Sequence, residues 1–260
     1  MDLSSALKEV LLAYFLLLSV VLFDLKNGYG VWRELVPVSV LSFLQLLLIG
    51  FVILYLAQVD RPELTLLVVF FMTLNAALIA RRRFRLKAYS GPWTYAFAFL
   101  AIAAVNYFLL LLYALVGILK VKAQFLVPFA GLLLAAGMRS LSLFSQYLTD
   151  LLAKERAVIE GMFALGAPPS AVRNYLLKKA VPLTTVVIRD MLKAAGIVHI
   201  PGVMVGMLLA GTHPLKAATM QFLVLSSMLF SMFFTPVVFY YLLTSFRGVF
   251  LVSPQEERGR

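Results

Sequence analysis

The sequence contains no cysteine and only two histidines, His199 and His213. The absence of cysteine excludes disulfide bonds, thiolate metal sites and a thiol nucleophile. Two imidazoles are too few ligands for a tight metal site, because transition metals are held by several nitrogen or sulfur ligands. Any metal that this chain handles is therefore expected to be weakly bound or already chelated.

Catalytic and nucleotide-binding motifs are also missing. The sequence has no H-E-x-x-H zinc-protease motif and no G-x4-G-K-[ST] phosphate-binding loop. An intramembrane aspartyl dyad needs two carboxylates, and only Asp190 lies well inside an apolar stretch. We therefore expect no enzyme activity, no catalytic residues and no cofactor bound by this chain, so energy must come from a partner or an ion gradient.

Charged residues are scarce, at 13% of the chain, whereas 62% of the residues are hydrophobic. Soluble domains carry about a quarter charged residues. The apolar residues form blocks of about 20, long enough to cross a hydrocarbon core of roughly 30 Å. This predicts an all-α, multi-pass membrane protein with one domain over 1–260. The seven predicted spans cover residues 7–23, 36–57, 64–80, 94–118, 125–148, 182–210 and 215–245.

Prolines and basic loops set the boundaries and the orientation. Basic residues crowd the loop after the third span, the loop between the fifth and sixth spans, and the C-terminal tail. The positive-inside rule places these segments in the cytoplasm and the N-terminus outside, in the cell membrane (the inner membrane of a bacterium). The net charge of +11 thus reflects topology and lipid, with no nucleic-acid partner expected. Prolines fall at or near six predicted span starts: Pro37, Pro62, Pro92, Pro128, Pro182 and Pro214.

A polar, amphipathic region at about 150–181 separates the fifth and sixth spans. Val158, Ile159, Met162 and Phe163 repeat at helical spacing. Residues 166–169, Gly-Ala-Pro-Pro, predict a turn and the start of a second helix that lies along the membrane surface and leads into the sixth span at Pro182. Such a helix pair either only connects two spans or serves as a contact surface.

The amino-acid sequence of this region resembles a known motif. Glu160, five residues, Gly166-Ala167 and a nearby proline are similar to E-x5-G-A-x-P, the coupling-helix motif of ABC-transporter permeases, in which this element docks into the ATPase subunit. Gly161-Met162 stands where importer permeases usually have Ala-Ala. The resemblance implies that these residues couple the chain to an ATPase: Glu160, Met162, Phe163, Leu165, Gly166, Ala167, Pro168 and Pro169.

Three further segments resemble one family. Asn75-Ala-Ala, ALGAPPSAV at 164–172 and IPGVMVGMLLAGTHPLKA at 200–217 are similar to FetB-type iron-export permeases and to plant aluminium-tolerance permeases. The resemblance implies a permease without its own nucleotide site, working as a homodimer with separate ABC ATPase subunits that bind ATP and Mg²⁺. It also implies export of iron or another metal-linked cargo. The alternative is a secondary transporter driven by an ion gradient.

The sixth predicted span contains Arg189, Asp190 and Lys193 in an apolar setting. Asp190 and Lys193 are three residues apart, so they can pair on one helix face. They form a structural ion pair, line a cavity for cargo or a proton relay, or lie at the membrane interface. Other candidates for the pathway are Asn75, Met204 and Met207, although methionine also fills cores.

Pro201 is expected to interrupt this span, because proline removes a helical hydrogen bond. Small residues then recur at four-residue spacing, which permits close helix approach in a dimer seam, a moving gate or ordinary bundle packing. Asn106 and Gln221 lie inside other spans and are expected to hydrogen-bond between helices. The residues predicted as hinge and close-packing positions are Pro201, Gly202, Gly206, Ala210 and Gly211.

Overall fold

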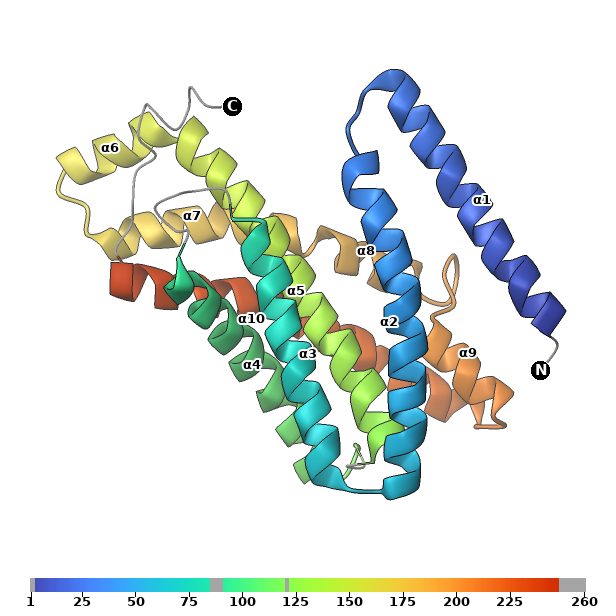
Figure 1. Cartoon of the computed structure of the whole chain (residues 1–260). Coiled ribbons are helices and arrows are strands. Elements are labelled where there is room, and N and C mark those ends of the chain that lie inside the picture. The colour runs from blue at the N-terminus through green and yellow to red at the C-terminus, as the bar shows by residue number, and fades with distance from the viewer. Residues whose placement is uncertain (1–2, 85–90, 120–121, 248–260) are drawn as a thin grey trace. The chain divides into compact units, whose positions relative to one another are not determined.

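The computed structural model describes residues 3–84, 91–119 and 122–247 (Figure 1). The basic residues Arg85, Lys87, Lys120, Arg258 and Arg260 lie outside them. The described residues form helices and no strand, apart from an isolated bridge between Ala195 and His199. The helices are α1 (Leu3–Asn27), α2 (Trp32–Val59), α3 (Pro62–Arg82), α4 (Pro92–Leu115), α5 (Ala123–Lys154), α6 (Arg156–Ala164), α7 (Pro169–Thr184), α8 (Val186–Ala194), α9 (Gly202–Leu209) and α10 (Pro214–Arg247).

The chain divides into two units, residues 1–60 and 61–260. The first unit is a helical hairpin of α1 and α2. Gly28 and Gly30 adopt positive φ angles of 72° and 80° between the two helices, which glycine allows at little cost. The buried Asp24 accepts a hydrogen bond of 2.7 Å from the backbone N–H of Trp32, the first residue of α2. A carboxylate at this position also interacts favourably with the helix dipole.

The second unit is built around α10, which contacts α4, α5, α7, α8 and α9. α5 in turn contacts α3, α4, α6 and α7. The core of this unit is apolar and tightly packed; its fully buried side chains include Ile102, Leu133, Leu141, Phe144 and Phe239. α5 and α10 are therefore the elements to which the rest of the unit is attached.

A layer of small and polar residues holds α4, α5 and α10 together. Ser231 on α10 donates a hydrogen bond of 2.7 Å to the side-chain carbonyl of Asn106 on α4. A β-carbon added at Gly137 on α5 would lie 3.0 Å from the hydroxyl oxygens of both Ser231 and Thr235, so a larger residue there would have to displace these side chains. One turn away, Tyr113 and Ser227 share a hydrogen bond of 2.6 Å. The expected interhelical role of Asn106 is confirmed.

Among the described residues, five helices are long and apolar enough to cross a membrane: α2, α3, α4, α5 and α10. They coincide with five of the seven predicted spans, and the predicted span 7–23 falls within α1. The expectation of one membrane span over 182–210 is wrong, because no single helix covers these residues. Those residues are divided among the end of α7, the nine-residue α8, a turn at 195–201 and the eight-residue α9. At 1.5 Å per residue, α8 and α9 are each about 12–14 Å long, less than half of a hydrocarbon core.

Prolines start several helices, as expected. Pro62, Pro92 and Pro214 are the first residues of α3, α4 and α10. Pro182, however, lies inside α7 near its end, and Pro37 and Pro128 lie inside α2 and α5. The predicted start of a span at Pro182 is therefore wrong, because α7 continues through it to Thr184.

Candidate functional site: a helical hairpin and a broken helix

The segment with the coupling-helix signature folds into a helical hairpin of α6 and α7. Gly166 has a φ of +81° and ends α6. Its N–H donates to the carbonyl of Phe163 at 3.0 Å, and the N–H of Ala167 donates to the carbonyl of Met162 at 2.9 Å. These two bonds form a Schellman motif, which satisfies the last carbonyls of a helix when the following residue is left-handed. The glycine is thus required by the backbone turn.

The second arm of the hairpin begins where the prolines predict. Pro168 is the N-cap of α7 and Pro169 its first residue, where a missing N–H does no harm. One side of α7 packs into the protein against α5 and α10, and its position along the membrane surface stays a prediction. Its buried residues are Val172, Leu176, Leu177, Ala180, Val181 and Thr184.

The tip of the hairpin carries an exposed apolar side chain. Leu165 is 90% exposed, whereas Phe163 and Met162 are half-buried. The exposed Glu160 is held by Arg156 in an ion pair of 2.7 Å on the same helix. Leu165 is therefore the apolar side chain that the tip exposes most, whereas Phe163 is partly covered within the hairpin.

The two arms are tied together at Glu155, between α5 and α6. Its carboxylate accepts hydrogen bonds from the hydroxyl of Tyr175 at 2.7 Å and from Nζ of Lys179 at 2.5 Å, both on α7. The hydrogen bond from Lys179, followed by that from Tyr175, lowers the pKa of Glu155 from its ordinary value of 4.5. The hydrogen bond to Glu155 likewise raises the pKa of Lys179. Both groups are therefore charged over a wide pH range.

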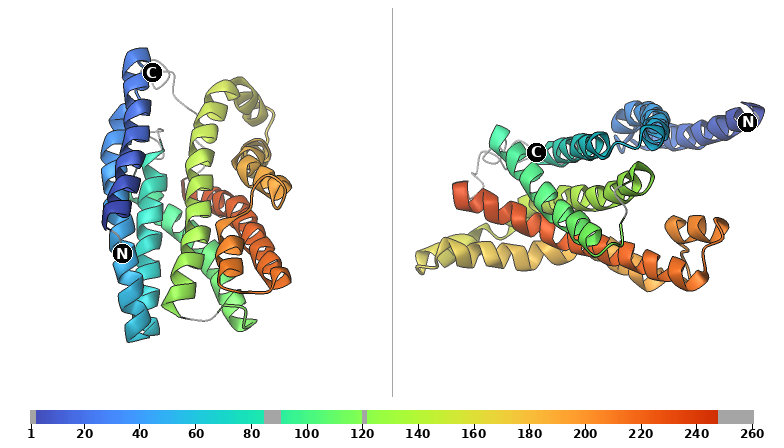
Figure 2. Two further views of the ribbon diagram at one scale, coloured as in Figure 1. Left: turned by 90° about the vertical axis from the view of Figure 1, so that its right-hand side faces the viewer. Right: turned by 90° about the horizontal axis from the view of Figure 1, so that it is seen from below.

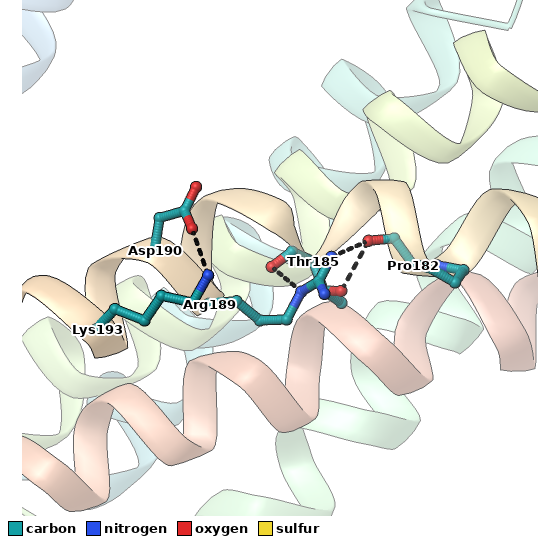
Figure 3. Close-up of polar contacts among 5 residues, drawn as sticks. All are labelled: Pro182, Thr185, Arg189, Asp190 and Lys193. Atoms are coloured by element: carbon teal, nitrogen blue, oxygen red, sulfur yellow. Dashed lines mark hydrogen bonds and ion pairs between the residues drawn. The ribbon is translucent and has the colours of Figure 1, made fainter.

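The broken segment begins at the junction of α7 and α8, which Figure 3 shows in detail. The carbonyl of Pro182 accepts hydrogen bonds from Nη2 of Arg189 at 2.8 Å and from the hydroxyl of Thr185 at 3.0 Å. Nε of Arg189 also donates to the carbonyl of Thr185 at 3.4 Å. Carbonyls at a helix end lack intrahelical partners, so Arg189 serves here as a cap of α7.

Asp190 and Lys193 form the expected pair on α8. Nζ of Lys193 lies 3.3 Å from Oδ1 of Asp190, and the two side chains are 64% and 78% exposed. Their charges therefore lie on an open face of the described chain (Figure 3). Ile188 on the opposite side of α8 is buried, which fixes the orientation of the charged face.

Residues 195–201 form a tight turn between α8 and α9, in which residues 196–200 are exposed and Pro201 is buried. Gly196, with a φ of +81°, donates its N–H to the carbonyl of His199 at 2.9 Å. Ile197 and Val198 at the tip of the turn are 88% and 84% exposed. The interruption expected at Pro201 is thus confirmed, but it extends over a whole turn in which the backbone is not helical.

The small residues of α9 face open space. Gly202, Gly206 and Ala210 are exposed, and nothing lies within 4 Å of a β-carbon added at either glycine. α9 has no buried residue and packs against α10. Ordinary packing within the chain, one of the three expected uses of this face, is therefore not what the described residues show.

α9 ends as α6 does. Gly211, at φ +80°, donates to the carbonyl of Leu208, and Thr212 donates to that of Met207, both at 2.9 Å. The half-buried Met204 donates its backbone N–H to Oε1 of Gln221 on α10 at 3.3 Å, which confirms an interhelical role for Gln221. Asn75 is exposed and its amide donates to the carbonyl of Phe71 on its own helix, so no described contact ties it to α8 or α9.

The hairpin and the broken segment lie at opposite ends of α10 (Figure 2, right). Asn174, early in α7, accepts a hydrogen bond from the hydroxyl of Tyr241, and Arg173 lies 4.0 Å over the ring of the same tyrosine. At the other end, Met204 bonds Gln221. The chain from α7 to α9 therefore runs along α10 in the opposite direction and connects the hairpin to the broken segment.

Sequence reasoning missed several residues of these regions. Glu155 lies 20 and 24 positions before Tyr175 and Lys179 in the chain, and no motif relates it to them. Thr185 and the capping role of Arg189 were also missed, because both depend on where α7 ends. Among the described residues, no group of three histidines or acidic residues could hold a metal ion.

Together, the long apolar helices and the absence of a sheet among the described residues define a multi-pass, α-helical membrane protein. Residues 7–247 match the group described as "Uncharacterised protein family (UPF0014)", and the chain belongs to this family. Its members include membrane permeases, so the resemblance to FetB-type permeases is confirmed.

Individual relatives are similar along most of their length. The "Probable iron export permease protein FetB" of Escherichia coli is 27% identical, and the match covers 84% of this chain and 82% of that protein. "Protein ALUMINUM SENSITIVE 3" of Arabidopsis thaliana is 28% identical, over 72% of this chain and 67% of that protein. The "UPF0014 membrane protein YjkA" of Bacillus subtilis is 28% identical, over 80% and 82%. No solved structure matches this chain.

Proposed function

We propose that this chain is the membrane-spanning permease subunit of a transporter driven by a separate ABC ATPase. The observation that carries the proposal is the α6–α7 hairpin, which has a capped turn, an exposed Leu165 and a base packed on α5 and α10. A docking element needs a rigid shape and a small apolar anchor. The hairpin has a capped turn and an exposed apolar side chain, and its residues 160–169 resemble the coupling-helix motif.

The proposed coupling follows from how the hairpin is attached. α6 continues from α5, and α7 continues through Thr185 into α8, which contacts α10. A displacement of the hairpin by the ATPase would therefore reach α5 by one arm and α8 by the other. Since α8 leads to the broken segment, movement at the cytoplasmic end would change the packing of residues 195–210 at the other end of α10.

The proposed cargo pathway lies beside the broken segment, at the contact between two copies of the chain. Met204 is level with Gln221, about two turns or roughly 10 Å into α10. Non-helical backbone at membrane depth is stable only inside protein or beside a water-filled cavity. The turn at 195–201, the charged face of α8 and the exposed Gly202 and Gly206 are therefore covered by a second copy and by water between the copies.

The cargo class rests on relatives. A relative's name refers to iron export and another's to aluminium sensitivity, so we propose export of iron or another metal-linked species. The open face with Asp190 and Lys193 suits a hydrated or chelated cargo, because it offers one carboxylate and one ammonium group in place of a closed ligand set. ATP and Mg²⁺ would bind to the ATPase.

A second candidate is a secondary transporter, favoured by the same exposed Asp190 and Lys193, which could exchange protons. The two candidates differ in their source of energy. We expect sealed vesicles that contain this chain and its ABC ATPase to move iron only when ATP is present on the ATPase side. Transport by the permease alone, driven by a proton gradient without ATP, would contradict the proposal and support the second candidate.

A further inference from the structure

Glu155 lies between α5 and α6 and contacts α7. It is the C-cap of α5 and the N-cap of α6. Its two carboxylate oxygens accept hydrogen bonds from Tyr175 and Lys179 on α7. Nζ of Lys179 also lies 4.7 Å from the centre of the Tyr175 ring. Three side chains therefore close a small ring that links the two arms of the hairpin at its base.

The covalent chain alone would not make the hairpin rigid. The helix path changes at Glu155, whose φ of −99° and ψ of 14° are not those of an α-helix, so α6 could pivot there relative to α5. Ile159 is buried and holds one side of α6. The ion pair between Arg156 and Glu160 joins two residues of α6. Tyr175 and Lys179 supply a restraint between Glu155, where α6 could pivot, and α7.

We propose that Glu155 is a positioning residue that, with Tyr175 and Lys179, fixes the hairpin to α5 so that force on its tip moves the membrane helices. This inference rests on the proposed function. If the clamp is open, the ATPase would still bind the tip, but α6 would turn about Glu155 and part of the movement would be lost. ATP would then be hydrolysed with less cargo moved.

The clamp should affect coupling more than folding. Lys179 and Glu155 are 40% and 22% exposed, and ion pairs at such sites contribute little to stability. The apolar contacts of Val172 and Leu176 remain when the pair is removed. A loss of transport per ATP without a loss of folded protein is therefore the specific signature of a positioning role.

Adjacent lysines provide a matched control. Lys179→Gln removes the clamp, whereas Lys178→Gln makes the same charge change at an exposed neighbour. On the purified full chain, we expect hydrogen exchange of the amides of residues 156–164 to rise about two- to fivefold in Lys179→Gln and to stay unchanged in Lys178→Gln. The charge swap Glu155→Lys with Lys179→Glu should restore slow exchange.

The functional arm measures iron moved per ATP in vesicles and ATPase capture by the same preparation. We expect Lys179→Gln to capture the ATPase as the unmodified chain does and to move less iron per ATP, and the charge swap to recover part of the loss. Equal exchange and equal iron per ATP in the two single variants would overturn the clamp. Failure of the unmodified chain to capture the ATPase would overturn the proposed function instead, and the exchange arm would still decide whether the clamp exists.

Discussion

The α6–α7 hairpin and the α8–α9 segment use the same local chemistry with opposite results. Each has a helix that ends on a left-handed glycine, Gly166 or Gly211, in a Schellman motif, followed within three residues by a proline that starts the next helix. The hairpin buries residues on both arms and is tied at Glu155. α9 buries none.

The two regions differ in how much of their surface is covered within one chain. The hairpin buries residues of both arms within one chain and exposes Leu165 at its tip. The α8–α9 segment leaves charges, non-helical backbone and a glycine face uncovered, and a membrane cannot satisfy the polar groups among them. Local capping therefore decides where a helix ends, whereas the contacts of its faces decide how much of the helix is buried.

The largest expected effects come from changing the two matched glycines. Valine at a φ near +80° is strained by roughly 1–3 kcal/mol, because its branched β-carbon meets the backbone. We expect Gly166→Val to abolish ATPase capture while leaving the chain inserted and dimeric. Gly211→Val should keep ATPase capture and lose transport. Affinity capture and vesicle flux on the same samples check both; identical losses would mean that the two regions do not have separate roles.

A bulky residue on the open face of α9 should break the proposed dimer. We expect Gly206→Leu to weaken self-association by about 1–3 kcal/mol, since it overfills a close helix contact. Gly50→Leu on α2, where a β-carbon also meets nothing within 4 Å, is the control and should leave association unchanged. Single-molecule photobleaching in liposomes measures the fraction of dimers. An unchanged dimer with full transport would remove this face from the seam.

The ion pair on α8 tests whether that face is covered in the working protein. If a second copy encloses it, Asp190→Ala leaves Lys193 unpaired in a medium of low polarity, which costs up to several kcal/mol. We then expect the double change Asp190→Ala with Lys193→Ala to transport better than Asp190→Ala alone. Additive losses in flux and in thermal stability would argue instead that the two residues act separately on cargo.

The smallest expected effect is the pH dependence of the hairpin. The pKa of Glu155 is lowered from 4.5, so its contribution to stability is present above pH 4.5 and is lost as the pH falls through the lowered value. The pKa of Lys179 is raised from 10.5, so its contribution is present below pH 10.5 and is lost as the pH rises through the raised value. The exchange difference between Lys179→Gln and the unmodified chain should therefore be constant between these two pH values and shrink outside them. A difference that titrates near pH 7 would point to another group.

Local signals in the sequence predicted the helix starts at Pro62, Pro92 and Pro214 and the turn at Gly166, because each depends on the conformation of one or two residues. The end of α7 could not be predicted in this way. Pro182 suggested a span start, but its carbonyl is satisfied by Thr185 and Arg189, and α7 is held by burial against α5 and α10. For Arg189, the sequence left open an ion pair, a pathway and a position at the membrane interface, because its capping contact with Pro182 depends on where α7 ends.

The exposure of the site residues could not be predicted either. Phe163 and Leu165 are equally apolar in a sequence, and only the three-dimensional position of α6 makes Leu165 the exposed one. The Glu155 clamp joins residues that are 20 and 24 positions apart, and its geometry depends on the packing of α7 beside α5. Pairing of Asp190 with Lys193 was predictable because it requires only one turn of helix.

The substitution Leu165→Ala tests most directly whether the α6–α7 hairpin is the contact for an ABC ATPase. Leu165 is 90% exposed, so its truncation should not affect folding, and Leu209, which is 85% exposed on α9, provides a matched control. We expect Leu165→Ala to weaken ATPase capture about tenfold or more and to reduce ATP-driven iron flux in the same preparation. Leu209→Ala should leave capture unchanged. If capture and flux both survive Leu165→Ala and also Phe163→Ala, the hairpin is only a connector and the account is contradicted.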